Sequence, residues 1–155
     1  MALSAGLLIP PFIKTFRQIN VSPTIAATEF VQGLDNYVRS GMNVAFGNFL
    51  AWSPPLTQII GVFSTPSIVP QIFATKLVSA IESGLSSIYT LYQISISVPY
   101  GLMLGDVVRI VSTPQPVPEI MATDLAVAID RECRSIVLSV SDPKLLGSPI
   151  YGPLI

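Results

Sequence analysis

Apolar residues recur at helical spacing in three stretches of the chain, and each stretch opens with a proline. In the third stretch, Met121, Leu125, Ile129 and Cys133 follow one another at steps of four. Such steps place the side chains on one stripe of a helix, so a helix of roughly 15–18 residues is predicted after each proline. Proline suits the first helical position because it lacks the N–H that would have no partner there.

The three stretches are versions of one sequence. Residues 22–35 read SPTIAATEFVQGLD, residues 69–82 read VPQIFATKLVSAIE, and residues 117–130 read VPEIMATDLAVAID. Each copy carries an isoleucine, the pair Ala-Thr, two further apolar positions and a closing acid, and the prolines lie 47 and 48 residues apart. Self-similarity at a period of roughly 20–50 residues indicates repeated supersecondary units. The aligned prolines are Pro23, Pro70 and Pro118.

Runs of β-branched and apolar residues flank the predicted helices. Before the second and third helices, residues 56–63 and 107–112 predict strands. After them, residues 92–98 alternate with a period of two and residues 135–141 are β-branched, which also predicts strands. Residues 43–52 form a less regular candidate behind the first helix. A HEAT-like solenoid of helical hairpins has a similar period, but the prolines and the Thr, Val and Ile runs argue against it.

The predicted fold is therefore α+β, with three related strand, Pro-rich turn, helix and strand units of about 47–48 residues. A chain of 155 residues is long enough for one domain with a core and too short for two ordinary ones. The single domain 1–155 divides into units of roughly 1–48, 49–95 and 96–143, with a tail at 144–155. We expect a pseudo-threefold arrangement about an axis or a short linear stack.

Composition limits where the apolar surface can go. Half of the residues are hydrophobic, 11% are charged, and the mean hydropathy is +0.64, whereas soluble domains carry about a quarter charged residues. The surplus apolar surface is expected to face a membrane or other protein subunits. The two long uncharged windows are interrupted by prolines, which disfavours a membrane-spanning protein. The N-terminus lacks the charged region of a cleaved signal peptide, so secretion by that route is not predicted.

No residue pattern points to catalysis or to a cofactor. The chain has no histidine, which excludes Ser-His-Asp and Cys-His catalysis and histidine metal sites. The three lysines stand in no recognisable frame with a serine, and no glycine-rich phosphate loop is present. The basic residues are scattered and the net charge is −1, so nucleic-acid binding is not predicted. Cys133 is the single cysteine and is predicted to be a small buried apolar residue.

Asp35, Glu82 and Asp130 close the three copies of the repeat and are the candidate metal ligands. If the units are related by a threefold axis, these carboxylates could converge on a hard cation. The competing interpretation places each of them on the polar face of its helix. We favour the second interpretation, because an oxygen site needs about six ligands and three are in view.

One dense patch of charged residues lies in the third predicted helix and continues past its closing acid. Spacings of three and four, such as that between Asp130 and Arg134, are typical of ion pairs on a helix surface. Solubility and a polar contact with a neighbouring subunit both remain open as roles for this patch. Its members are Asp124, Asp130, Arg131, Glu132 and Arg134.

These features favour a non-enzymatic structural subunit of a large protein assembly, with other protein subunits as partners. We expect a bacteriophage virion protein assembled in the host cytoplasm, of the minor capsid, cement or neck-tail connector kind, because small apolar proteins without cofactors are common there. The Pro-rich ends LLIPPF and SPIYGPLI are expected to act as extended arms. The alternatives are a membrane-associated protein and a carrier of a small apolar ligand, the latter with one pocket of several hundred Å³.

Overall fold

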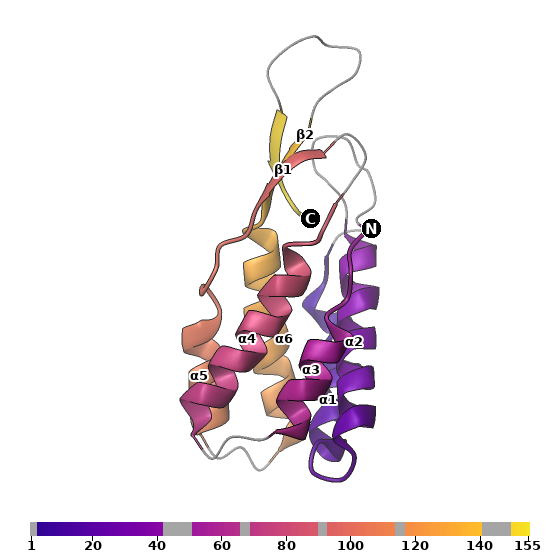
Figure 1. Cartoon of the computed structure of the whole chain (residues 1–155), viewed down its shortest axis with the longest axis vertical. Coiled ribbons are helices and arrows are strands. Elements are labelled where there is room, and N and C mark those ends of the chain that lie inside the picture. The colour runs from indigo at the N-terminus through magenta and orange to yellow at the C-terminus, as the bar shows by residue number, and fades with distance from the viewer. Residues whose placement is uncertain (1–2, 42–50, 66–68, 90–92, 114–116, 141–149) are drawn as a thin grey trace.

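The computed structural model describes residues 3–41, 51–65, 69–89, 93–113, 117–140 and 150–155 (Figure 1). These residues are mostly helical, with a small antiparallel sheet at one end, which agrees with an α+β class. The helices are η1 (Ala5–Leu7, a short 3₁₀ helix), α1 (Ile9–Gln18), α2 (Pro23–Ser40), α3 (Leu56–Ser64), α4 (Pro70–Leu85), α5 (Leu104–Ser112) and α6 (Pro118–Arg134). The strands are β1 (Gln93–Ser97), β2 (Val137–Val140) and β3 (Ile150–Pro153).

The three long helices begin where the repeat predicts. Pro23, Pro70 and Pro118 each occupy the first turn of α2, α4 and α6. Val69 and Val117, which precede two of these prolines, have extended backbones with ψ of 111° and 110°. A proline ring disfavours the helical conformation in the residue before it. The repeated proline therefore sets both the end of the connecting turn and the start of the helix.

The predicted strands at 56–63 and 107–112 are wrong, because both segments are helices. Residues 56–63 lie in α3 and residues 107–112 in α5. Their apolar residues recur at three- and four-residue steps, so a helix buries Ile59 and Phe63 on one face of α3. Burial against neighbouring helices outweighs the modest strand preference of Val and Ile. α3 therefore pairs with α4, and α5 with α6, as helical hairpins. The prolines and the Thr, Val and Ile runs do not exclude paired helices here.

The strands predicted behind the second and third helices are confirmed. β1 and β2 pair antiparallel, with Ile96 opposite Leu138, and β2 pairs antiparallel with β3. The sheet lies beyond the ends of α4 and α6, at the opposite end of the molecule from the turns inside the hairpins (Figure 1). Most of the candidate strand at 43–52 lies outside the described residues, and Ala51 forms an isolated bridge with Tyr89.

The two Pro-rich ends do not form extended arms where the structure describes them. Pro10 and Pro11 lie in the first turn of α1, where the missing N–H of proline costs nothing. Ile150–Pro153 form β3, an edge strand that pairs with β2 alone within the three-stranded sheet. An edge position tolerates Pro153 because one side of the strand needs no ladder hydrogen bonds.

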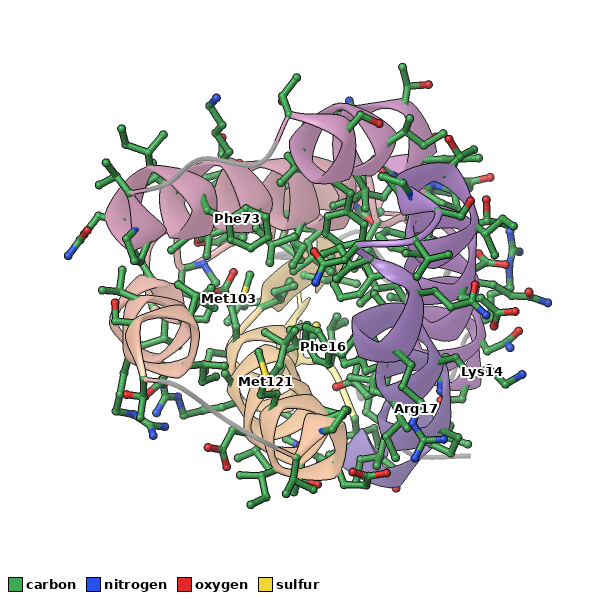
Figure 2. The ribbon with its side chains drawn as sticks, turned by 90° about the horizontal axis from the view of Figure 1, so that it is seen from below. Lys14, Phe16, Arg17, Phe73, Met103 and Met121 are labelled. Carbon is green, nitrogen blue, oxygen red and sulfur yellow. The ribbon has the colours of Figure 1, made fainter. Side chains whose placement is uncertain are left out.

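The six α-helices form a closed ring. Each packs on the helix before it and the helix after it, and α6 returns to pack on α1. Figure 2 looks along this ring from the end that carries the hairpin turns, and it shows Phe16, Phe73, Met103 and Met121 directed toward the interior. Ring closure gives every helix two neighbours, so a wide apolar face can be buried on each one.

Equivalent repeat positions supply the centre of the core. An aromatic series crosses four helices, with ring centroids 4.5 Å apart for Phe12–Phe30, 5.7 Å for Phe30–Phe63 and 6.4 Å for Phe63–Phe73. The alanine of each Ala-Thr pair is fully buried. The buried equivalents are Phe12, Ile59 and Val107; Ala27, Ala74 and Ala122; Phe30, Leu77 and Leu125; and Leu34, Ile81 and Ile129.

Gly84 allows α4 to approach the segment that leads into α3. A Cβ added there would lie 2.7 Å from Cδ of Pro55 and 3.0 Å from the ring of Trp52, whereas one added at Gly61 in α3 would meet nothing within 4 Å. We expect Gly84→Ala to lower the free energy of unfolding by about 1–3 kcal/mol through overpacking. Gly61→Ala, the matched control, should raise it by up to about 1 kcal/mol because alanine favours the helix. Urea denaturation of the two variants measures both effects, and equal shifts would contradict the close packing.

Candidate functional site

The three closing acids do not meet at one point. Within the described residues, no group of three or more Asp, Glu, Cys or His side chains is placed to hold a metal ion. Asp35, Glu82 and Asp130 instead bind different protein donors, one in each hairpin. The structure therefore brings together none of the ligand set that a threefold cation site would need.

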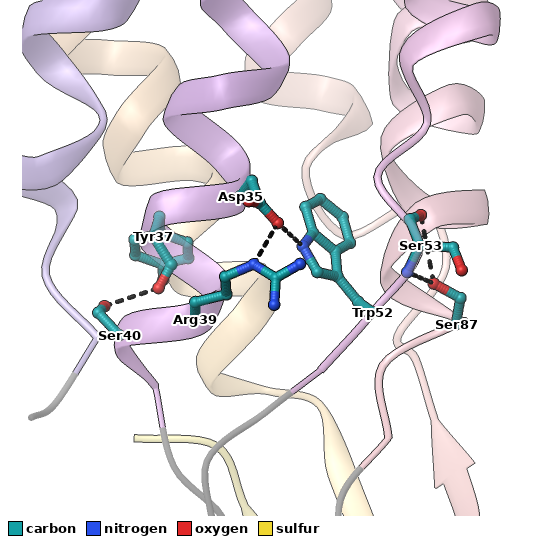
Figure 3. Close-up of polar contacts among 7 residues, drawn as sticks. All are labelled: Asp35, Tyr37, Arg39, Ser40, Trp52, Ser53 and Ser87. Carbon is teal, nitrogen blue, oxygen red and sulfur yellow. Dashed lines mark hydrogen bonds and ion pairs between the residues drawn. The ribbon is translucent and has the colours of Figure 1, made fainter.

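Asp35 joins α2 to the segment that precedes α3. Its Oδ1 accepts a hydrogen bond of 2.9 Å from Nε1 of Trp52 and another of 2.8 Å from Nε of Arg39 (Figure 3). Trp52 is buried, so its indole N–H needs a partner, and the carboxylate supplies one. A second hydrogen bond holds the segment before α3 in place. The amide of Ser53 donates to Oγ of Ser87, which follows α4, at 2.8 Å.

Glu82 joins α4 to the segment that precedes α5. Its Oε1 accepts a 2.5 Å hydrogen bond from the backbone N–H of Gly101. Gly101 has a φ of +82°, a left-handed conformation that glycine adopts without steric cost. The carboxylate therefore stabilises a tight turn at Gly101. A residue with a side chain at this position would have a strained backbone.

Asp130 joins α6 to the first hairpin. It accepts a 2.7 Å hydrogen bond from the hydroxyl of Tyr37 in α2, and it pairs with Nε of Arg134 at 2.8 Å. Arg134 in turn donates to the carbonyl oxygen of Leu3, which precedes α1. Each closing acid thus helps to hold its long helix to the beginning of the next hairpin, and the third connection returns to the first hairpin.

Glu132 is a buried acid that the sequence interpretation placed wrongly on the helix surface. Its side chain is 0% exposed. Its Oε2 accepts a 2.9 Å hydrogen bond from the N–H of Met103, while Oε1 has no donor among the described protein groups. Its position three residues after Ile129, on the apolar stripe of α6, was the available sequence signal. The rest of the patch does form surface ion pairs, including that between Asp130 and Arg134.

Glu132 and Glu82 act as one carboxyl pair. Burial raises the pKa of Glu132 to about 7, the Met103 N–H lowers it, and the charge of Glu82 and a hydrogen bond with the Glu82 carboxyl raise it. A hydrogen bond between two carboxyl groups requires a proton on one of them, and Glu132 Oε1 has no donor among the described protein groups. With its pKa raised to about 7, the Glu132 carboxyl is protonated in mildly acidic solution.

Cys133 and Tyr37 form a neutral buried cluster beside this pair. Both side chains are buried, which confirms the packing role predicted for the cysteine. Burial raises the pKa of the Cys133 thiol and of the Tyr37 hydroxyl far above their ordinary values. A thiol held neutral in this way is a poor nucleophile and a poor metal ligand.

Each hairpin carries a groove between its short and long helices. The grooves have volumes of about 340 Å³ between α1 and α2, 410 Å³ between α3 and α4, and 140 Å³ between α5 and α6. Gly33, Ala80 and Ala128 line them at corresponding positions of the repeat. Aligned positions of the sequence therefore line all three grooves.

Ion pairs bridge two of these grooves. Lys14 lies 3.8 Å from Glu29 in the first, and Arg109 lies 3.7 Å from Asp124 in the third. In the second hairpin the same repeat positions hold Gly61 and Lys76. Lys76 lines the groove, and no ion pair of Lys76 is found among the described residues. Ion pairs this exposed contribute about 0–1 kcal/mol each to the free energy of unfolding. They therefore change the charge pattern of the grooves but add little to the stability of the fold.

Comparison of the chain with protein-family models, with curated proteins and with solved structures gives no match. In the described part of the chain, no helix combines the length and the apolar character that a bilayer crossing requires. What the molecule does is therefore inferred from its own surface and its own buried groups.

The hydrogen bond between Asp35 and Trp52 can be tested with the chain's single tryptophan. Asp35→Ala leaves the buried indole N–H without its acceptor, so we expect a loss of about 1–3 kcal/mol in the free energy of unfolding. Tryptophan emission should shift to longer wavelength as water reaches Trp52. Glu29→Ala, which removes a long surface ion pair with Lys14, is the control and should change stability by less than about 1 kcal/mol. Equal losses in the two variants would contradict the linking role of Asp35.

Proposed function

We propose that this chain is a non-enzymatic structural subunit of a large protein assembly, which acts by burying apolar surface against other subunits. The observation that carries the proposal is a set of exposed aliphatic side chains at one end of the helix ring. They occupy the turns within the three hairpins and the first turns of the long helices. We call this set the apolar rim, and its members are Val21, Ile25, Val69, Ile72, Val117 and Ile120.

The repeat itself supplies the apolar rim. Ile25, Ile72 and Ile120 are the aligned isoleucines of the three copies, and each is about half exposed. The first turns of α2, α4 and α6 lie at the same end of the molecule (Figure 1). A residue that recurs in all three copies but adds little to the core of any of them is well suited to a contact outside the chain. Single exposed aliphatic residues are ordinary, whereas a group at one end supports an interaction surface.

We further propose that the three hairpins are related by a pseudo-threefold axis along the ring. Three features support this arrangement: the hairpins follow one another at 47 and 48 residues, the helices close into a ring, and the three grooves share their lining positions. Such a chain presents three similar surfaces to its surroundings, which suits a threefold position in a symmetric particle.

Among large assemblies we propose a bacteriophage virion, with the chain as a minor capsid, cement or neck-tail connector protein assembled in the host cytoplasm. The support is the combination of small size, low charge and a surface with repeated apolar contacts. Mass spectrometry of purified particles tests this directly. Recovery of the chain from intact virions at a fixed ratio to the shell protein is the expected result, and its absence from them would overturn the virion assignment.

A membrane-associated protein is the second candidate, because the apolar rim could also enter a lipid surface. The nearest charges do not favour this. Arg17 is paired with Glu119, so an anionic headgroup would have to compete with that carboxylate. Flotation of the protein with anionic lipid vesicles distinguishes the two candidates. The subunit proposal expects the protein to stay in the aqueous fraction.

The apolar rim predicts self-association or subunit association that depends on its isoleucines. We expect the triple variant Ile25→Ser, Ile72→Ser, Ile120→Ser to weaken association. Burial of each isoleucine side chain contributes about 1–2 kcal/mol to the free energy of association. Val127→Ser, an equally exposed change on the side of α6, is the matched control. Sedimentation velocity over a concentration series gives the oligomeric state of each variant. Unchanged sedimentation of the triple variant, with wild-type circular dichroism, would overturn the role of the apolar rim.

A further inference from the structure

The Glu82–Glu132 pair holds a turn of the chain that lies between β1 and α5. Glu82 projects from α4 and Glu132 from α6, so the pair spans two long helices. Glu82 accepts from the N–H of Gly101 at 2.5 Å, and Glu132 accepts from the N–H of Met103 at 2.9 Å. Two carboxyl groups from different hairpins therefore accept hydrogen bonds from two backbone amides of one segment. This segment comprises residues 98–103, and we call it the docked turn.

The docked turn combines buried anchors with an exposed tip. Val98 and Met103 are buried at its two ends, whereas Tyr100 and Leu102 are exposed between them. Its internal hydrogen bonds run from the N–H of Tyr100 to the carbonyl of Val98 and from the N–H of Leu102 to that of Pro99. The Gly101 and Met103 amides are not used within the turn, so the two carboxyl groups provide their acceptors.

The charges around the pair compensate it only in part. Burial raises the pKa of Glu132 by more than the charge of Arg131 lowers it. Arg131 also donates a 3.3 Å hydrogen bond to the carbonyl oxygen of Leu102 in the docked turn. On α6, Arg131 carries an exposed guanidinium that pairs with Asp106 of α5, and Cys133 is neutral. On α2, the hydroxyl of Tyr37 is neutral and donates to Asp130, which is itself paired with Arg134. The docked turn contributes amides and the exposed Tyr100. No cation among the described residues therefore forms an ion pair with Glu82 or Glu132.

A single proton on the carboxyl pair removes the unfavourable state in which both groups are ionised. With both groups ionised, two negative charges would lie out of water, and Glu132 Oε1 would have no donor. With Glu132 protonated, its O–H can donate to the Glu82 carboxylate, while each carboxyl group still accepts from one amide of the docked turn. Moving the docked turn away admits water, and hydration stabilises the doubly ionised state instead.

We propose that the Glu82–Glu132 pair is a proton-operated latch, which holds residues 98–103 against the helix ring most tightly when the pair carries one shared proton. This inference does not depend on the proposed function. It assigns to the docked turn a conformational equilibrium of its own, separate from global unfolding. Loss of the proton favours a state in which Tyr100 and Leu102 leave their fixed positions and Met103 is uncovered.

The direction of the pH dependence follows from the proton balance. With the turn closed, Glu132 keeps its proton up to about pH 7, because its pKa is raised above its ordinary value of 4.5. With the turn open, the group titrates near that ordinary value. Closure therefore binds a proton between these limits. The latch is at full strength below about pH 4.5 and weakens as the pH rises, and the weakening is complete above about pH 7.

Amide hydrogen exchange measured by NMR tests the latch in the intact chain. Rates for Gly101 and Met103 are corrected for intrinsic exchange and compared from pH 4.5 to pH 8. We expect their protection factors to fall by up to about tenfold per pH unit and to level off above about pH 7, because one proton is coupled to closure. Amides in the middle of α2 should not show this slope.

Glu132→Gln is the decisive variant. A glutamine there can accept from Met103 with its oxygen and donate to Glu82 with its NH₂, which mimics the shared proton at every pH. Protection of Gly101 and Met103 should then be independent of pH. Glu29→Gln, a surface change, is the control and should keep the wild-type slope. Glu82→Gln gives a second test from the other helix, should Glu132→Gln fail to fold.

Three results would overturn the latch. The first is flat protection of Gly101 and Met103 between pH 4.5 and pH 7 in the wild-type protein. The second is an unchanged slope in the Gln variants. The third is an equal slope for the α2 amides, which would assign the effect to global unfolding.

Discussion

The packing of α6 against α1 is the contact on which the rest of the structure depends. Without it the three hairpins form an open row, and the end helices each lose a neighbour. With it the row becomes a ring, and the apolar faces of all six helices meet at a common interior. A chain with 11% charged residues has few polar side chains to cover open helix faces. Closure of the ring buries the apolar helix faces that the few charged side chains of the chain could not cover.

Charge in this protein is used mainly for connections between segments. Asp35 and Glu82 each fasten a long helix to the segment that precedes the next short helix, and Asp130 with Arg134 fastens the last long helix to the chain before α1. The three connections differ in chemistry, with an indole, a backbone amide and an arginine as donors. A common position with different partners fits a structural requirement at each hairpin junction. It does not fit a shared ligand, which would require the three acids to converge.

The buried pair of Glu82 and Glu132 sets the second hairpin junction apart from the other two. At the repeat position of Glu132, the first copy has Tyr37 and the second has Gly84, so only the third copy places an acid there. An acid placed in the interior costs stability unless a proton or a partner neutralises it. Here the cost is offset by a hydrogen bond to a turn, and the result is a group that responds to pH near neutrality.

The sequence by itself determined the three long helices and the two strands that follow the second and third of them. Proline at the first turn, apolar residues at steps of three and four, and alternation with a period of two are local signals, and local geometry obeys them. The closing acids were also visible, since they belong to the repeat. The short helices α3 and α5 were not, because a run of six to eight residues rich in Val and Ile suits a strand or a helix until its neighbours are known. Tertiary structure alone decided which donor each acid meets and that the hairpins close into a ring. Those outcomes depend on contacts between residues far apart in the chain, and the free energy of such contacts is absent from any local pattern.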